Sequence, residues 1–170
     1  MLIKIIEVIV LIILALASDI KTYKIKNSIV YPFMLIGIVT NLVLGGIEGL
    51  IFSLTGLFIT ILLMIILFVL RMQGAGDIKL FGAIGSIMGL KFALYTIAYS
   101  YLFGGVMALI VMLINKNGKK RLMYLINYIR SCFLSLSLLP YTDFKDKSDG
   151  AKFHFSYAIF CGTIIQLFLV

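Results

Sequence analysis

The stretch Leu50–Leu70, LIFSLTGLFITILLMIILFVL, contains no charged side chain. A helix needs about 20 apolar residues to cross the hydrocarbon core of a bilayer, and this stretch has that length. An uninterrupted apolar run of this kind is typical of a helix that faces lipid rather than water. The stretch therefore predicts a transmembrane helix, and it sets the class of the whole chain.

The composition agrees with that class. Of the 170 residues, 62% are hydrophobic and only 13% are charged, and the mean hydropathy is +1.16. A soluble domain of this size cannot hide so much apolar surface, and ordinary soluble proteins have about 25% charged residues. The polar segments are too short for a separate soluble domain. We therefore expect residues 1–170 to form one membrane-embedded domain.

Six apolar runs divide the chain: Leu2–Ala17, Ile29–Leu44, Leu50–Leu70, Ile78–Leu90, Phe92–Ile114 and Phe155–Val170. The first lacks a small-x-small cleavage site before Asp19, so we interpret it as a retained helix rather than a signal peptide. The fourth run is short, and its end is open between Leu90 and Tyr95. The predicted fold class is all-α and polytopic, with six transmembrane helices.

Residues 122–139 have a different pattern. Their apolar side chains recur at helical spacing with polar ones off that stripe, and Arg130 lies in the middle. A charge at the bilayer centre is costly. We therefore predict one amphipathic helix that lies in the membrane interface.

The net charge of +8 comes from cations at the ends of the apolar runs. With the N-terminus outside and the 122–139 helix on the inner face, only Lys4 and Lys91 remain outside, and the other 13 of the 15 lysines and arginines lie inside. This distribution follows the positive-inside rule. The charge therefore indicates membrane orientation and not nucleic-acid binding.

In this topology two acids at helix ends fall on the cytoplasmic side, whereas Asp143, Asp146 and Asp149 lie in a Lys-rich polar loop and are interpreted as solvated. Asp19 directly follows the first helix, and Asp77 opens the fourth after Gly74-Ala75-Gly76. Acids at a membrane boundary are candidates for function, and two carboxylates that share a site push one member to hold a proton. Such a pair can activate water and polarise a peptide carbonyl. Gly74 and Gly76, which lack Cβ atoms, would let a substrate backbone approach. The residues alone leave open a small proton- or cation-coupled transporter or a non-catalytic assembly protein.

Two segments resemble boxes of the type IV prepilin peptidases. Residues 19–27, DIKTYKIKN, resemble the first aspartate box. That box begins with an aspartate, has a basic residue two positions after it, and ends in Ile-Pro-Asn. Residues 74–89, GAGDIKLFGAIGSIMG, resemble the second box, GxGD followed by Lys-Leu and a glycine-rich helix. Lys26 replaces the usual proline. Residues 152–162, KFHFSYAIFCG, are similar to a third segment of the family but lack its prolines. The resemblance runs from about residue 10 onward.

The resemblance implies a membrane aspartic endopeptidase with Asp19 and Asp77 as its catalytic pair. Lys21, Asn27 and Lys79 belong to the same boxes and would shape the site, although both lysines also suit a head-group anchor. Its substrates would be type IV pilin-like precursors with a basic leader, cut at the cytoplasmic boundary of the cell membrane. No metal or organic cofactor is implied, and the oligomeric state stays open. A related GxGD protease that acts on preflagellins or other membrane peptides is the nearest alternative.

Larger members of the family also carry an N-terminal segment with paired CxxC motifs and methylate the new N-terminus. These motifs do not occur in the chain, so we expect peptidase activity only. The small residues Gly82, Gly85, Ser86 and Gly89 predict a face for close helix packing, which would hold Asp77 near the first helix. His154, the only histidine, is interpreted as an interfacial side chain, with a contact to substrate as the alternative.

Overall fold

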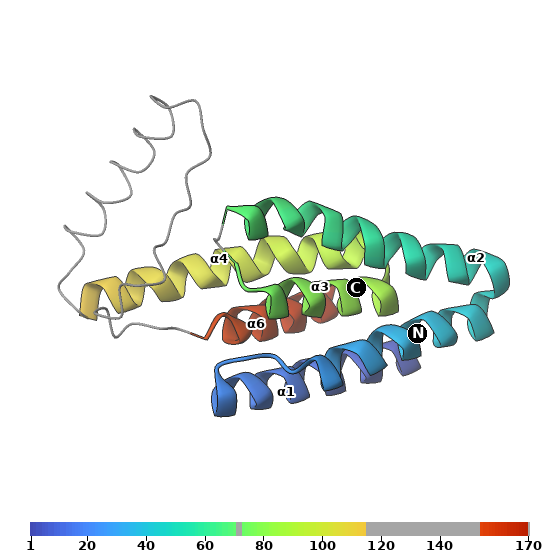
Figure 1. The fold of residues 1–170 in the computed structure, drawn as a ribbon, viewed down its shortest axis with the longest axis horizontal. Coiled ribbons are helices and arrows are strands. Elements are labelled where there is room, and N and C mark those ends of the chain that lie inside the picture. The colour runs from blue at the N-terminus through green and yellow to red at the C-terminus, as the bar shows by residue number, and fades with distance from the viewer. Residues whose placement is uncertain (71–72, 115–153, 170) are drawn as a thin grey trace, which may run out of the picture.

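The computed structural model describes residues 1–70, 73–114 and 154–169. Their elements are helices without exception: α1 (Leu2–Thr22), α2 (Asn27–Val69), α3 (Ala75–Met88), α4 (Leu90–Ile114) and α6 (Phe155–Leu169), which run side by side in Figure 1. The all-α prediction is confirmed for these residues. The interfacial helix predicted at 122–139 lies outside the described residues.

Helix α2 is two antiparallel arms joined at Gly46. This glycine has φ +59° and ψ −141°, a left-handed conformation that breaks the helix and that glycine adopts without a steric penalty. The chain then folds back so closely that a Cβ on Gly49 would lie 1.9 Å from the Asn41 carbonyl oxygen. The arms match the predicted runs Ile29–Leu44 and Leu50–Leu70. Helices therefore cover nearly all described residues of the six predicted apolar runs.

Helix α3 is the centre of the bundle and packs against α1, α2 and α4. Nearly every residue from Ile78 to Ile87 is buried, and Phe81, Ala83 and Ile84 have no exposed surface. Helix α6, in turn, packs against α1 and α4. The start of α3 and the end of α1 are therefore fixed by packing and not by the loops alone.

The small face of α3 packs as predicted, but against the second arm of α2. A Cβ on Gly85 would lie 2.4 Å from the Gly56 carbonyl oxygen, and one on Gly82 would lie 2.8 Å from Ile61. The two backbones can approach this closely only because both crossing residues are glycines. The sequence indicated no packing partner for this face, and its close neighbours in the structure lie in α2.

The end of α3 is at Gly89, whose φ of +84° breaks the helix before α4 begins at Leu90. An extension past Lys91 toward Tyr95 is therefore wrong. The last carbonyls of a helix have no partner within it, and lipid cannot supply one. Asn41 Nδ2 donates to the Ser86 and Ile87 carbonyls at 2.9 and 3.1 Å, and Ser53 Oγ donates to the Ser86 carbonyl at 2.6 Å.

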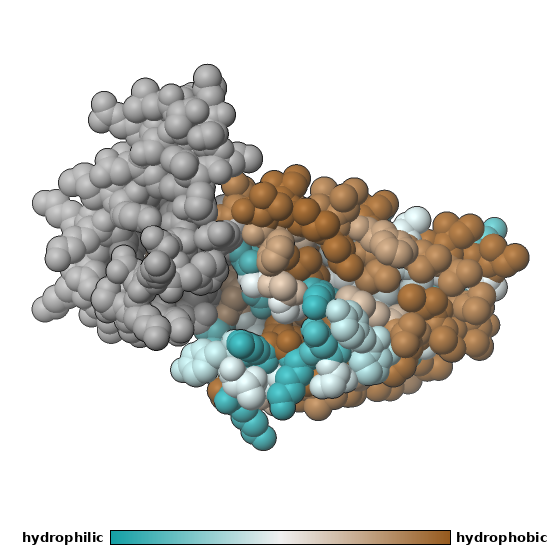
Figure 2. Space-filling model, in the orientation of Figure 1, coloured by the Kyte–Doolittle hydropathy of each residue, from teal (hydrophilic) through white to brown (hydrophobic). Residues whose placement is uncertain are grey.

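The outside of the described bundle is apolar. Figure 2 shows a hydrophobic surface over most of this face, with hydrophilic residues gathered toward the left-hand end. Large apolar residues with more than half of their surface exposed include Leu35, Phe58, Leu62, Ile66 and Leu102. A broad exposed apolar surface on a folded protein indicates contact with lipid or protein. Two helices, Asn27–Val69 and Leu90–Val111, are long and apolar enough to cross a membrane, and Phe155–Leu169 is a shorter apolar helix. The number of six spans stays a prediction.

Candidate active site

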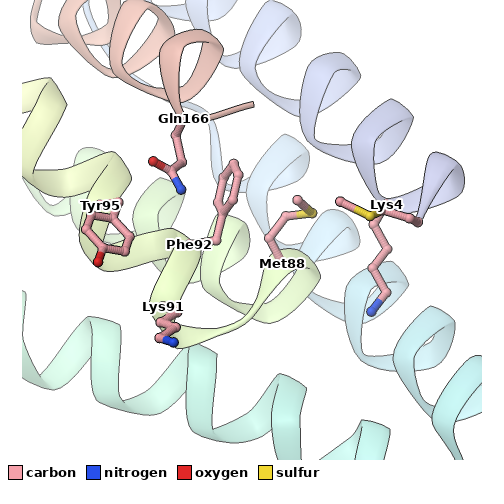
Figure 3. Close-up of a pocket in the computed structure, with 7 residues that line it drawn as sticks. Lys4, Met88, Lys91, Phe92, Tyr95 and Gln166 are labelled. Carbon is pink, nitrogen blue, oxygen red and sulfur yellow. The ribbon is translucent and has the colours of Figure 1, made fainter. Parts of the chain in front are cut away.

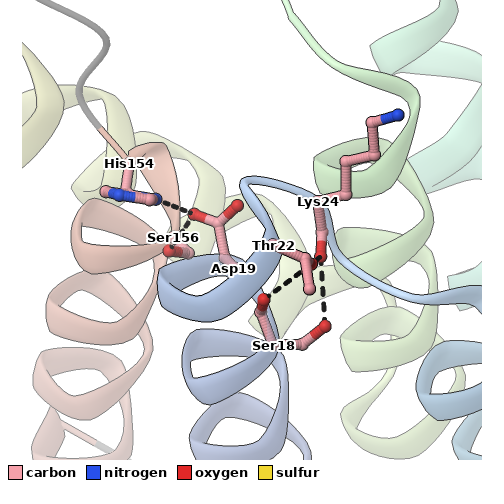
Figure 4. Close-up of polar contacts among 6 residues, drawn as sticks. All are labelled: Ser18, Asp19, Thr22, Lys24, His154 and Ser156. Carbon is pink, nitrogen blue, oxygen red and sulfur yellow. Dashed lines mark hydrogen bonds and ion pairs between the residues drawn. The ribbon is translucent and has the colours of Figure 1, made fainter.

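The turn that follows Asp19 is pinned by hydroxyl groups. Ser18 Oγ donates to the Lys24 carbonyl at 3.0 Å, and Thr22 Oγ1 lies 2.9 Å from the Ser18 carbonyl oxygen and 3.0 Å from that of Lys24 (Figure 4). Tyr23 ends α1 in a left-handed conformation with φ 54°, and its N–H bonds the Asp19 carbonyl. These contacts fix the turn although Lys26 stands where the family has proline.

The Gly74–Asp77 segment begins α3 directly against this turn. Gly74 precedes the helix with φ −75° and ψ 146°, and Asp77 lies in the first helical turn. A Cβ on Gly76 would lie 3.2 Å from Ile25 Cβ, so the absence of a side chain lets the turn after α1 rest on α3. A Cβ on Gly74 would be 3.4 Å from Asp77 Oδ2. The two predicted aspartate segments therefore meet at one end of the bundle.

The Asp77 carboxyl holds its proton unusually tightly. Asp77 directly precedes Ile78–Leu90, the apolar run that is predicted to cross the membrane. Burial, and next the negative charge of Asp19, raise the pKa of Asp77 from 3.8 to about 7, and contacts to Gln73 and the Gly74 backbone offset part of this rise. Gln73 is in turn held by the Tyr101 hydroxyl, which donates to its Oε1 atom. The Asp19 and Asp77 carboxyls thus interact electrostatically.

The Asp19 carboxyl is buried and is bound from α6. Its Oδ2 atom lies 2.6 Å from Ser156 Oγ, which donates to it, and 3.0 Å from His154 Nδ1 (Figure 4). The side chains of Asp19 and His154 are 13% and 16% exposed. The interpretation of His154 as an interfacial side chain missed this contact, and Ser156 was not singled out. Two signals pointed to this region: His154 is the only histidine in the sequence, and residues 152–162 are similar to a segment of the prepilin peptidases.

Two other predicted site residues, Asn27 and Lys79, link the segments that carry Asp19 and Asp77. Lys79 Nζ donates to Asn27 Oδ1 at 3.1 Å and lies 5.2 Å from the centre of the Tyr31 ring. Lys79 therefore has protein partners in addition to any head-group role. Lys21 is exposed, which fits the anchor interpretation.

A cavity of about 460 Å³ lies at the other end of the bundle. It is lined by Met1, Lys4, Met88, Lys91, Phe92, Tyr95 and Gln166 (Figure 3). Lys4 and Asp19 are 15 residues apart on α1, which is roughly 22 Å along a helix. This cavity therefore does not belong to the aspartate site. Among the described residues, no three His, Cys, Asp or Glu side chains gather as metal ligands.

The comparisons with known proteins bear on this pair of segments. The sequence model of the type IV leader peptidase family matches residues 6–109, which is more than half of the chain and includes both aspartates. No curated protein and no solved structure matches at a significant level. The matched region covers α1 to most of α4 and stops before His154 and Ser156. The chain belongs to the type IV leader peptidase family.

Proposed function

We propose that this protein is a membrane aspartic endopeptidase in which Asp19 and Asp77 act as a catalytic pair. One observation carries the proposal. Two carboxyls from separate segments interact at one end of the bundle, and the pKa of Asp77 is raised to about 7, in part by the charge of Asp19. Such a pair holds one acid and one base at neutral pH, as acid–base hydrolysis of a peptide requires.

The reaction follows from these protonation states. The Asp19 carboxylate takes a proton from water as the water oxygen attacks the scissile carbonyl carbon. The protonated Asp77 carboxyl donates a hydrogen bond, and then its proton, to the carbonyl oxygen. The tetrahedral diol then collapses: the C–N bond breaks, one hydroxyl proton returns to Asp77, and the proton on Asp19 passes to the leaving amine. The products are a carboxyl and an amine, and both aspartates return to their starting states.

The substrate class comes from the family and from the position of the site. Membership of the type IV leader peptidase family implies pilin-like precursors as substrates in general. By the resemblance to the prepilin peptidases, we propose precursors in which a basic leader precedes an apolar helix. We propose that the apolar helix of the precursor lies beside the lipid-exposed bundle and brings its boundary with the leader to Asp19 and Asp77. A preflagellin-type substrate has the same design, so it is the closest second candidate.

Cleavage of a synthetic precursor by the purified protein tests the activity. The precursor has a short Lys/Arg leader followed by an apolar helix, and mass spectrometry identifies the cut. We expect one cut at the leader boundary. Glu48→Gln is a matched carboxyl variant, since Glu48 is exposed in the turn of α2, and it should cut like the wild type. The transporter alternative would be supported by two results together. The precursor would stay intact, and liposomes that contain the protein would show a flux of protons or cations.

The orientation needs a separate experiment. We propose that Asp19 and Asp77 face the cytoplasm of the cell membrane and that the turn around Glu48 faces outward. Single cysteines at Lys24, Glu48 and Lys147, in a background without Cys132 and Cys161, report this topology. A thiol reagent that cannot cross the membrane, added from outside, should label only the cysteine at position 48. Labelling at position 147 from outside would mean that residues 122–139 cross the membrane.

A further inference from the structure

The Asp19 side chain is contacted by Ser156 of α6 and by His154, which directly precedes that helix, and both contacts are to the same oxygen. Ser156 Oγ is 2.6 Å from Asp19 Oδ2, and His154 Nδ1 is 3.0 Å from the same atom. Among the residues drawn in Figure 4, none bonds the second oxygen. Within the described part of the chain, one oxygen of Asp19 is therefore occupied and the other is open to a further partner.

Both contacts supply donors that a carboxylate can accept. Ser156 Oγ donates to Asp19 Oδ2, and His154 donates to the same atom when its proton is on Nδ1. Hydrogen bonds to an ionised acceptor are short and strong, as the 2.6 Å distance is. Ser156 also lies in the first turn of α6, where the helix dipole stabilises a negative charge.

The imidazole ring is itself held in place. Tyr23 stacks on His154 with ring centres 4.3 Å apart and an angle of 24° between the planes, and Tyr157 meets its edge at 6.1 Å. Tyr23 adopts a left-handed backbone conformation that is unfavourable for a residue with a Cβ, and such conformations gather at functional sites. The turn after α1 thus holds the tyrosine ring against the histidine that binds Asp19.

We infer that His154 and Ser156 are positioning residues that keep Asp19 as the ionised member of the pair, with Oδ2 occupied and the other oxygen free for the attacking water. This assigns Asp19 as the base and Asp77 as the acid, and it rests on the proposed function. Neither His154 nor Ser156 lies in the segment that matches the family, residues 6–109.

Few other ionisable groups surround this contact in the described part of the chain. Asp77 faces Asp19 from α3, and Tyr23 and Tyr157 contact His154 from α1 and α6. Lys21 and Lys24 are exposed. Phenol side chains are uncharged at acid pH, so a change in the acid limb of the activity profile reports Asp19 and its two donors.

The test is the pH profile of kcat/KM for cleavage of the synthetic precursor. Ser156→Ala removes the hydroxyl donor and Ser156→Thr keeps it. His154→Phe keeps the stack on Tyr23 but removes the N–H, whereas His154→Asn keeps a donor near the position of Nδ1. Thr163→Ala is the control, because Thr163 is a buried hydroxyl of α6 that bonds the Ile159 carbonyl and not Asp19.

Loss of either donor should make Asp19 easier to protonate. We expect Ser156→Ala and His154→Phe to move the acid limb upward by about one pH unit, so that kcat/KM on that limb falls about tenfold. Ser156→Thr, His154→Asn and Thr163→Ala should leave the limb in place. Thermal unfolding of all five variants in detergent identifies any loss that comes from misfolding.

Three outcomes separate this inference from the proposed function. If the wild type cuts the precursor but Ser156→Ala and His154→Phe lower kcat/KM equally at every pH, both residues are structural and the assignment is overturned. A downward shift of the limb would also overturn it. If the wild type does not cut at all, it is the proposed function that fails.

Discussion

Lys79 donates a hydrogen bond to Asn27 across 52 positions of sequence, with 3.1 Å between Nζ and Oδ1. The first residue of α2 is thereby linked to the first turns of α3, which carry Asp77. Asn27 comes shortly after Asp19, and Lys79 shortly after Asp77. The contact therefore ties together the segments that position the two aspartates.

Replacement of Lys79 by methionine should weaken that tie. The contact is exposed, so we expect only about 0.5–1 kcal/mol of stability to be lost. Precursor cleavage should fall several-fold, because the two segments lose a link. Lys21→Met is the matched control: Lys21 also follows an aspartate by two residues, but its side chain is exposed, and its replacement should have little effect. Equal losses in both variants would show that the lysines act only as head-group anchors.

Gly85→Ala should destabilise the bundle strongly. The new Cβ would lie 2.4 Å from the carbonyl oxygen of Gly56, so the two backbones must separate. Overpacking of this kind costs about 1–3 kcal/mol. Gly105→Ala is the matched control on α4, since a Cβ there meets no atom within 4 Å. Thermal unfolding in detergent gives the comparison, and a Gly85→Ala protein as stable as the Gly105→Ala protein would contradict the packing of α3 on α2.

Gly76→Val should abolish cleavage although Asp77 remains. A Cβ at this position already lies 3.2 Å from Ile25 Cβ, so a branched side chain would push the turn after α1 away from α3. A displacement of a catalytic group by about 1 Å can lower the rate by about 10²-fold. If that contact is the cause, Ile25→Ala in the same chain should restore at least part of the activity per folded molecule. No restoration would mean that the substrate or the backbone itself requires the glycine.

The stability of the protein should depend on pH through Asp77. Its pKa is about 7 in the folded protein against 3.8 ordinarily, so the folded state binds this proton more tightly than the unfolded state does. The stabilisation is therefore complete below pH 3.8 and is lost as the pH rises through about 7. Asp77→Asn cannot ionise. Its unfolding temperature should fall less than that of the wild type between about pH 4 and 8. An equal fall in both proteins would show that Asp77 is not held protonated.

The sequence predicted the parts of the fold that follow from local patterns. Long apolar runs such as Leu50–Leu70 need helices in lipid, and the small residues around Gly85 predicted a close packing face. The turn at Gly46 fell between two predicted runs. The end of α3 was less clear, because apolar residues continue on both sides of Gly89, and only its positive φ shows the break.

The polar contacts of the candidate site could not be predicted in the same way. Asp19 and Asp77 were recognisable because each has a local motif that contains an aspartate. His154 is 135 positions from Asp19, and the similarity of residues 152–162 to a family segment gave it no role. Its partner depends on how α6 packs against α1, which no periodicity reveals. Lys79 illustrates the same limit. An exposed cation near a membrane boundary suggests a head-group anchor, and only the fold brings Asn27 beside it.

The most direct measurement of the central claim compares wild type, Asp19→Asn, Asp77→Asn and the double variant on one synthetic precursor, normalised to folded protein. Asparagine keeps the size of the side chain but cannot exchange the catalytic proton. Residues that act as a unit are not additive, so each single variant should lose about 10⁴-fold or more, and the double variant should be no worse than either. Substantial cleavage by either single variant would contradict an aspartic pair at this site.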